Sequence, residues 1–139
     1  DISIRSSHLF DNKKILDMCL QKSPFPVVWC VSSDGTLLGL TYLPEQSIGA
    51  WHKHDTDGHF ESVTSVTEGE DDVLYAIVRR HVNGRDLRYV ERMKPRKFTS
   101  QKDYYFMDGG LTYRGNPIST VSNLGLLEGK TVCVLADGS

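Results

Sequence analysis

The residues best suited to chemistry lie between Trp51 and His59. On a β-strand, His52 and His54 would point to the same side, and the pair could hold a metal ion together with a carboxylate such as Asp57. Such a site would suit a metal-dependent hydrolase. The third ligand would have to reach the pair across a glycine-containing turn, and an exposed polar strand end is the commoner origin of such residues. A metal site is therefore an alternative and not the main expectation.

Other catalytic patterns are missing from the sequence. It has no glycine-rich phosphate loop, no G-x-S-x-G nucleophile motif and no H-E-x-x-H motif. The acidic residues at 70–72 lack the ligand spacing of a calcium loop. We therefore expect no enzymatic activity and no cofactor.

Arginines are concentrated on one predicted hairpin, in strands 73–82 and 85–93. Arg79 would lie directly opposite Arg88, an arrangement that repels unless an acidic group lies nearby. The formal net charge of the chain is −2, which gives no general attraction to nucleic acid. We expect negligible affinity for double-stranded DNA and assign Arg79, Arg80 and Arg88 to pairing with acidic surfaces of another subunit or domain. Trp51 is a further interface candidate.

Composition places the chain among ordinary globular proteins. Hydrophobic residues make up 39% of its 139 residues and charged residues 24%. No apolar run approaches the roughly twenty residues of a membrane span. The three cysteines form no close-spaced pair, so we expect reduced thiols in a protein that folds in cytoplasm. Because the chain opens without methionine and closes in a turn signal, we expect a fragment of a longer polypeptide.

Two glycine-containing dipeptides, Asp34-Gly35 and Asn83-Gly84, predict β-hairpins with two-residue turns at positive φ. Counting outward from the first turn pairs residue 31 with 38, 29 with 40 and 27 with 42. All six residues are apolar and share one face, so we place Trp29 in the core.

Counting outward from the second turn pairs Val78 with Tyr89, besides Arg79 with Arg88. Both faces of this hairpin carry apolar and charged residues. The pattern therefore leaves its buried face open.

Strands at 14–21 and 60–67 precede the two hairpins at a spacing of 46 residues, and a further strand at 47–54 follows the first. A strand–hairpin–strand unit every forty to fifty residues is the period of β-propeller blades, and a plain meander or sandwich is the alternative. We expect an all-β protein of antiparallel hairpins resembling propeller blades. Residues 1–93 would form this region, with 1–12 as the last strand of a preceding unit.

A proline-containing charged stretch at 94–102 predicts a linker. Residues 103–139 would then begin a second small β domain, with short strands at 103–107, 111–113 and 131–135.

Several strings occur together in a recognisable order. They are SHLF (7–10), DGTLLGLTY (34–42), AWHKH (50–54), FESV (60–63), RYVER (88–92), DGGLTY (108–113), LEGKTV (127–132) and LADG (135–138). In this order the chain resembles the tail nozzle proteins of short-tailed bacteriophages and their prophages, also called tail tubular protein B or phage stabilisation proteins.

The resemblance implies a structural virion component with propeller-type blades and no catalysis. Six copies would form a ring that continues the tail channel below the portal and adaptor proteins, and DNA would pass without specific binding. The protein would be made in the bacterial cytoplasm and reside in the virion tail. A carbohydrate- or receptor-binding β module, suggested by Trp51, Tyr104 and Tyr105, remains an alternative, as does the hydrolase using His52 and His54.

Overall fold

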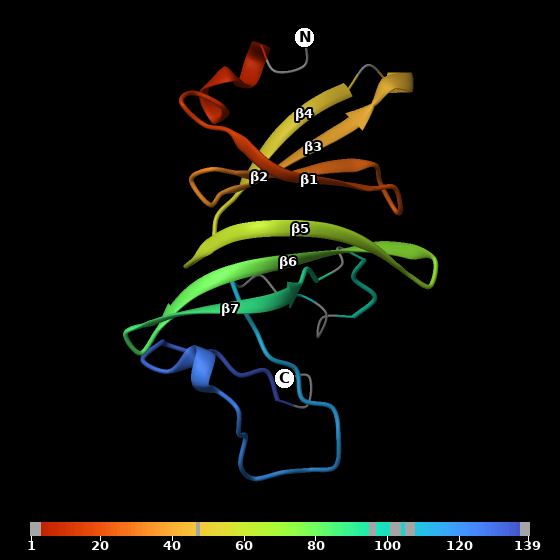
Figure 1. The fold of residues 1–139 in the computed structure, drawn as a ribbon. Helices are drawn as coiled ribbons and strands as arrows, with labels where there is room; N and C mark the ends of the chain where they lie inside the picture. Colours follow the sequence, from red (N-terminus) through yellow and green to blue (C-terminus); the bar gives the residue numbers. More distant parts are fainter. Residues whose placement is uncertain (1–3, 47, 95–96, 101–103, 105–107, 137–139) are drawn as a thin grey trace.

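A computed structural model describes residues 4–46, 48–94, 97–100, 104 and 108–136. The described chain is all-β, as expected, with seven strands in two antiparallel sheets that do not close on each other (Figure 1). The strands are β1 (Ile15–Gln21), β2 (Val27–Ser32), β3 (Leu37–Leu43), β4 (Ile48–His54), β5 (His59–Glu68), β6 (Asp71–Val82) and β7 (Arg85–Arg92). Short 3₁₀ turns are η1 (Ile4–Leu9), η2 (Pro44–Gln46) and η4 (Gly125–Leu127).

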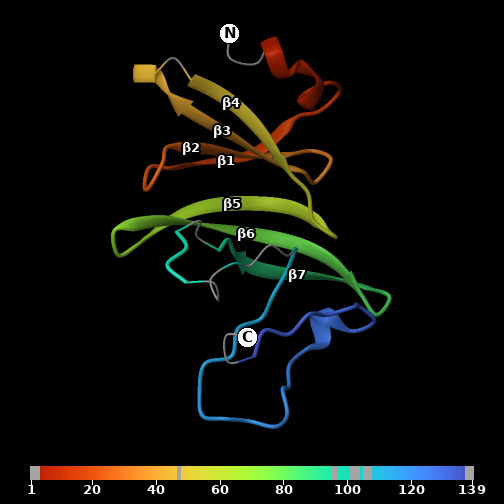
Figure 2. The ribbon, with the colours of Figure 1, turned by 180° about the vertical axis from the view of Figure 1, so that it is seen from behind.

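Each sheet is a meander in which every strand pairs with the next along the chain. Sheet A has the order β1-β2-β3-β4 and sheet B the order β5-β6-β7. The two sheets form successive layers, as Figures 1 and 2 show from opposite sides. Their first strands are joined by Asp17 of β1, whose carboxylate accepts hydrogen bonds from the Ser62 hydroxyl (2.7 Å) and the Val63 N–H (2.9 Å) of β5. Two meanders packed face to face fit both alternatives that the sequence raised, consecutive propeller blades and a sandwich.

The core lies between the sheets. Its buried members come from both layers: Trp29, Val31 and Leu37 from sheet A, and Val63, Leu74, Ala76 and Val78 from sheet B. Trp29 is only 3% exposed, and its indole N–H donates to the Gln21 side-chain oxygen at 2.9 Å. The prediction that Trp29 belongs to the core is confirmed.

The hairpin at Asn83-Gly84 has the predicted register. Val78 pairs with Tyr89 and Arg79 with Arg88, while φ is 49° at Asn83 and 72° at Gly84. Positive φ at both central residues defines the turn type that suits a two-residue hairpin loop. The face that includes Val78 is the buried one.

The register predicted for the first hairpin is wrong by one residue. Val31 pairs with Leu37 rather than Leu38, because the loop is longer than two residues: the Ser32 N–H donates to the Thr36 carbonyl at 2.9 Å. Gly35 takes the positive φ (80°) that such a loop requires at its last position. A slip of one residue turns a strand over. Leu37 therefore joins the core, and Leu38 is buried on the opposite face of sheet A.

Three other strand predictions are wrong. The segment expected as a strand within 1–12 contains η1, and neither 111–113 nor 131–135 is a strand. The latter two segments satisfy a strand pattern but have no neighbouring strand in the described chain to complete their hydrogen bonds. The expected strand at 103–107 lies outside the described residues except for Tyr104. The linker at 94–102 and the second domain at 103–139 remain predictions.

No helix within the described ranges has the length and apolar character needed to cross a membrane.

Candidate functional site

The two candidate metal ligands of β4 lie side by side. His52 Nδ1 is 2.8 Å from His54 Nε2, and both rings meet the edge of Trp29 at centroid distances of 5.5 and 5.2 Å. The His52 ring lies over Gly39, where the β-carbon of any larger residue would come within 2.1 Å of the ring. Both imidazole rings are therefore packed against Trp29 of the core, and His52 also against the backbone of Gly39.

The structure does not bring a third ligand to this pair. Among the residues that are described, no group of three or more His, Cys, Asp or Glu side chains could hold a metal ion. Asp57, the predicted carboxylate ligand, instead pairs with Lys130. The short contact between His52 and His54 also occupies one nitrogen of each ring. The arrangement favours a hydrogen-bonded pair over a metal centre.

Trp51 lies on the face of sheet A opposite His52. Its ring meets Phe10 edge-on, with centroids 4.8 Å apart, and its side chain is half-buried. Strand alternation explains why neighbours in the sequence have such different surroundings. Trp51 helps to cover the far side of sheet A, and its role at an interface remains a prediction.

Arg80 forms the most deeply buried charged centre of the described chain. Its side chain is 7% exposed and makes two parallel hydrogen bonds to Glu91, with Nε–Oε1 at 2.5 Å and Nη2–Oε2 at 2.8 Å. Its Nη1 also donates to the Asp57 carbonyl at 3.0 Å and the Asp108 carboxylate at 3.1 Å. Arg80 thus ties the β4–β5 turn and the segment after β7 to sheet B.

The electrostatics of this centre favour full ionisation. The Glu91 hydrogen bonds raise the pKa of Arg80 above its ordinary value, against the opposing effect of burial. Burial acts to raise the pKa of Asp108, but hydrogen bonds from Thr56, the Asp57 N–H and Arg80 outweigh it and leave that pKa lowered. Removing one partner of such a buried ion pair is strongly destabilising, so Arg80 holds these segments together.

Glu61 separates the two arginines that oppose each other across β6 and β7. Its carboxylate contacts Arg79 Nε at 3.2 Å and Arg88 Nε at 2.6 Å. The pairing of β5 with β6 shifts between Phe60 and Ser62, so Glu61 is the extra residue of a β-bulge. The bulge places a carboxylate beside both guanidinium groups and removes the repulsion that the sequence implied.

Further ion pairs extend this outer face of sheet B. Arg79 also pairs with Asp86 at 3.0 Å, and Arg92 pairs with Glu68 at 2.5 Å. Hydrogen bonds from Arg92 and then from the Tyr75 hydroxyl lower the pKa of Glu68 to about 2, despite partial desolvation.

Acidic partners for Arg79, Arg80 and Arg88 are present within the chain itself, Asp108 in the segment predicted as a second domain among them, and a role of these arginines at an interface remains a prediction. Neither Glu61 nor Asp108 was singled out from the sequence: the bulge leaves no local signal, and Asp108-Gly109-Gly110 has the composition of a simple turn.

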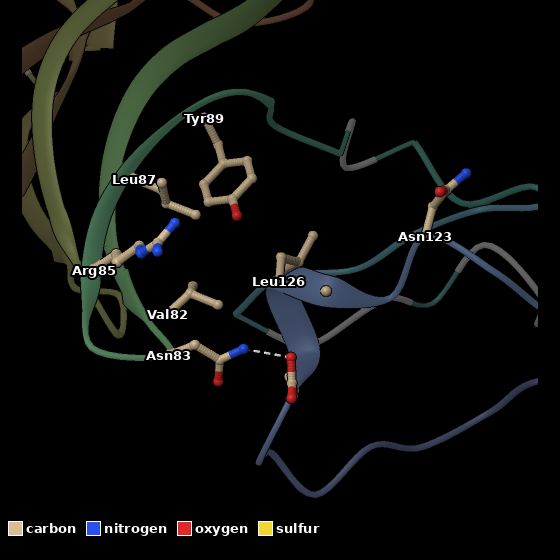
Figure 3. Close-up of a pocket in the computed structure, with 9 residues that line it drawn as sticks. Val82, Asn83, Arg85, Leu87, Tyr89, Asn123 and Leu126 are labelled. Carbon is tan, nitrogen blue, oxygen red and sulfur yellow. Dashed lines mark hydrogen bonds between the residues drawn. The ribbon is translucent and has the colours of Figure 1, made fainter.

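A shallow groove lies between the β6–β7 hairpin tip and η4 (Figure 3). Its volume is about 590 Å³, and its lining comprises Val82, Asn83, Arg85, Leu87, Tyr89, Asn123, Gly125, Leu126 and Glu128. The Asn83 side chain donates a hydrogen bond to Glu128, which fastens η4 to the hairpin. The groove combines aliphatic walls with a guanidinium and a phenol.

These side chains can hold the sheets together and bind polar surfaces. The chain matches no known protein-family model and no curated protein.

Proposed function

We propose that this chain is a structural module of a phage tail, of the nozzle type, and that it performs no catalysis. Its partners are other copies of itself in a ring and the neighbouring tail or portal-adaptor proteins. The protein is made in the bacterial cytoplasm and functions in the virion tail. DNA passes along the assembled channel without specific binding.

The observation that carries this proposal is the blade-like packing of two successive meanders. Sheet A and sheet B follow one another along the chain, and Asp17 joins their first strands. A repeated sheet unit serves as scaffolding, since each unit offers edges and faces for further packing. The ordered strings that resemble nozzle proteins run through both sheets.

The charge distribution supports the proposed channel role. Protein cations that contact phosphates release counterions and give salt-dependent DNA binding, which would retard passage. Here the guanidinium groups of Arg79, Arg80 and Arg88 are neutralised by carboxylates of the same chain. The arginine-rich hairpin therefore offers little net attraction to DNA.

Localisation in virions tests the proposal. Antibodies raised against the chain should label purified particles at the tail by immunogold electron microscopy, and the encoding gene should adjoin a portal or adaptor gene. Labelling of the host cytoplasm or membrane, with none on particles, would contradict the proposal. Antibodies absorbed with the purified chain provide the matched control.

DNA binding provides a second test. We expect no shift of double-stranded DNA at physiological salt in a mobility assay. Tight, salt-sensitive binding that is lost in Arg79→Ala/Arg88→Ala would favour a nucleic-acid-binding role instead.

The groove at the hairpin tip favours one other candidate, a carbohydrate- or receptor-binding module. Arg85 and Tyr89 both line it, and they suit an acidic sugar or a carboxylate-bearing peptide. Glycan-array binding that disappears in both Arg85→Ala and Tyr89→Ala, with Arg88→Ala as the control outside the groove, would support this second function. An array without reproducible binding would remove it.

A further inference from the structure

The outer edge of sheet B is formed by β7, which pairs only with β6 in the described chain. In sheet A the corresponding third strand, β3, is hydrogen-bonded to β4 along its other edge. Edge strands expose backbone N–H and C=O groups that readily accept another strand. Val90 on this edge is 75% exposed, and charged residues surround it.

The hairpin register shows which backbone groups of β7 are available. Val82 and Arg85 close the two-residue turn as a hydrogen-bonded pair, and the alternation continues to Met93, whose N–H donates to the Leu74 carbonyl. The odd-numbered residues of β7 therefore bond to β6. The outward groups belong to Asp86, Arg88, Val90 and Arg92.

We propose that β7 pairs antiparallel with β7 of a second copy of this chain, about a two-fold axis at Tyr89. The two three-stranded sheets then form one continuous sheet across the dimer. Isologous pairing of this kind uses the same surface on both copies.

Charge selects this register. Outward groups can pair only with outward groups, so the longest overlaps are centred on Arg88 or on Tyr89. Centring on Arg88 places that residue opposite its own copy, and like charges directly opposed are destabilising. Centring on Tyr89 opposes Asp86 to Arg92 at both ends and brings the two phenol rings together. No like charges are then opposed.

The pairing also continues an ionic chain that already exists in each copy. Asp86 accepts from Arg79 at 3.0 Å, and Arg92 pairs with Glu68 at 2.5 Å. Contact between Asp86 and Arg92 of the second copy joins these two pairs into one network. Charged edges normally prevent association, but here alternating signs make one register complementary.

This inference does not rest on the proposed tail function. A two-fold contact closes on itself, whereas a ring grows through head-to-tail contacts. Ring contacts would use other surfaces, so a dimer without virion localisation, or the reverse, would separate the two proposals.

Cysteine cross-linking tests the axis directly. In a Cys133→Ser background, Tyr89→Cys should form a disulfide-linked dimer under mild oxidation, because a non-hydrogen-bonded pair brings its α-carbons to about 4.5 Å. Arg88→Cys is the matched control and should cross-link poorly. Equal cross-linking of both variants, or none by Tyr89→Cys, would overturn the proposal.

Charge exchange tests the register independently of any cysteine. In sedimentation equilibrium the unmodified chain should dimerise, and Asp86→Arg or Arg92→Asp should each weaken dimerisation about tenfold. The double variant Asp86→Arg/Arg92→Asp should recover part of it, because the contact between copies is regained while the pairs with Arg79 and Glu68 within each copy stay lost. Because these positions lie far apart along one strand, rescue requires contact between copies. A monomeric unmodified chain, or failure of the double variant to recover dimerisation, would contradict the pairing.

Discussion

Sheets A and B share the same meander topology but are stabilised by different interactions. Sheet A buries apolar side chains on both faces, with Trp29 toward sheet B and Leu38 on the far side. Sheet B buries one face, and its other face is covered by a ladder of ion pairs around Glu61 and Glu68. The same meander topology can therefore be stabilised either by apolar packing or by ion pairs. The two sheets differ in what lies over the outer face. Phe10 of the N-terminal segment packs on Trp51 over sheet A, whereas sheet B carries ion pairs there.

The two sheets can be compared at two aromatic residues that lie 46 positions apart in the sequence. Trp29 lies in β2 and Tyr75 in the longer β6, separated by the same 46 residues as the repeat. Trp29 faces the core, whereas Tyr75 faces the ionic side and donates to Glu68 at 2.5 Å.

The largest expected effect is the loss of Trp29. Trp29→Ala should destabilise the fold by about 3–5 kcal/mol, because a buried aromatic leaves a large cavity, and this is comparable with the stability of a small domain. Tyr75→Ala should cost about 1–2 kcal/mol, chiefly for one hydrogen bond and partial burial. Urea unfolding followed by circular dichroism measures both. Equal losses would show that the two faces are packed alike.

The next largest effect separates buried from exposed charge within sheet B. Arg80→Met should destabilise by about 3 kcal/mol, because it leaves Glu91 and Asp108 without their buried partner. The neighbouring exposed pair supplies the control: Arg88→Met should cost much less, because water screens the Arg88–Glu61 pair. If Arg80→Met unfolds at the same urea concentration as the unmodified protein, the buried centre contributes no net stability.

A smaller effect compares the two hairpin turns. Gly35 and Gly84 both have positive φ, so alanine at either position should cost about 1–2 kcal/mol in backbone strain. At Gly35 the new β-carbon would also meet the His59 ring within 2.5–2.8 Å, whereas nothing lies within 4 Å at Gly84. Gly35→Ala should therefore lower the melting temperature more than Gly84→Ala, and Gly84→Val more than Gly84→Ala. The reverse order for the two alanine variants would contradict the loop geometry.

The smallest effect is the response of sheet B to acid. The pKa of Glu68 is lowered to about 2 by Arg92 and Tyr75, so its contribution is present above its unfolded pKa and is lost as pH falls. Stability should decrease between about pH 4.3 and pH 2. Glu68→Gln should flatten this dependence in thermal melts, whereas Glu45→Gln, outside the ladder, should not. Identical slopes for the two variants would exclude Glu68 as a contributor.

Turn dipeptides and the alternation of apolar residues predicted much of the fold. The features that they did not predict depend on contacts between residues far apart in the sequence. The Asn83-Gly84 turn predicted the pairing of β6 with β7, and alternation predicted the strands of both sheets. Asp34-Gly35 serves either a two-residue or a longer loop, so the register of β2 with β3 depended on packing. At the candidate sites, the adjacency of His52 and His54 was predictable, but the place of Asp57 was not.

The amino-acid sequence by itself determined the all-β class, the burial of Trp29 and the register of the second hairpin, because backbone preferences and side-chain alternation act over a few residues. The tertiary structure decided which charges are paired. Arg80 meets Asp108 across 28 residues, and Glu61 reaches Arg88 across 27 through a bulge. It also decided that 111–113 and 131–135 do not become strands, since a strand needs a neighbour to complete its hydrogen bonds.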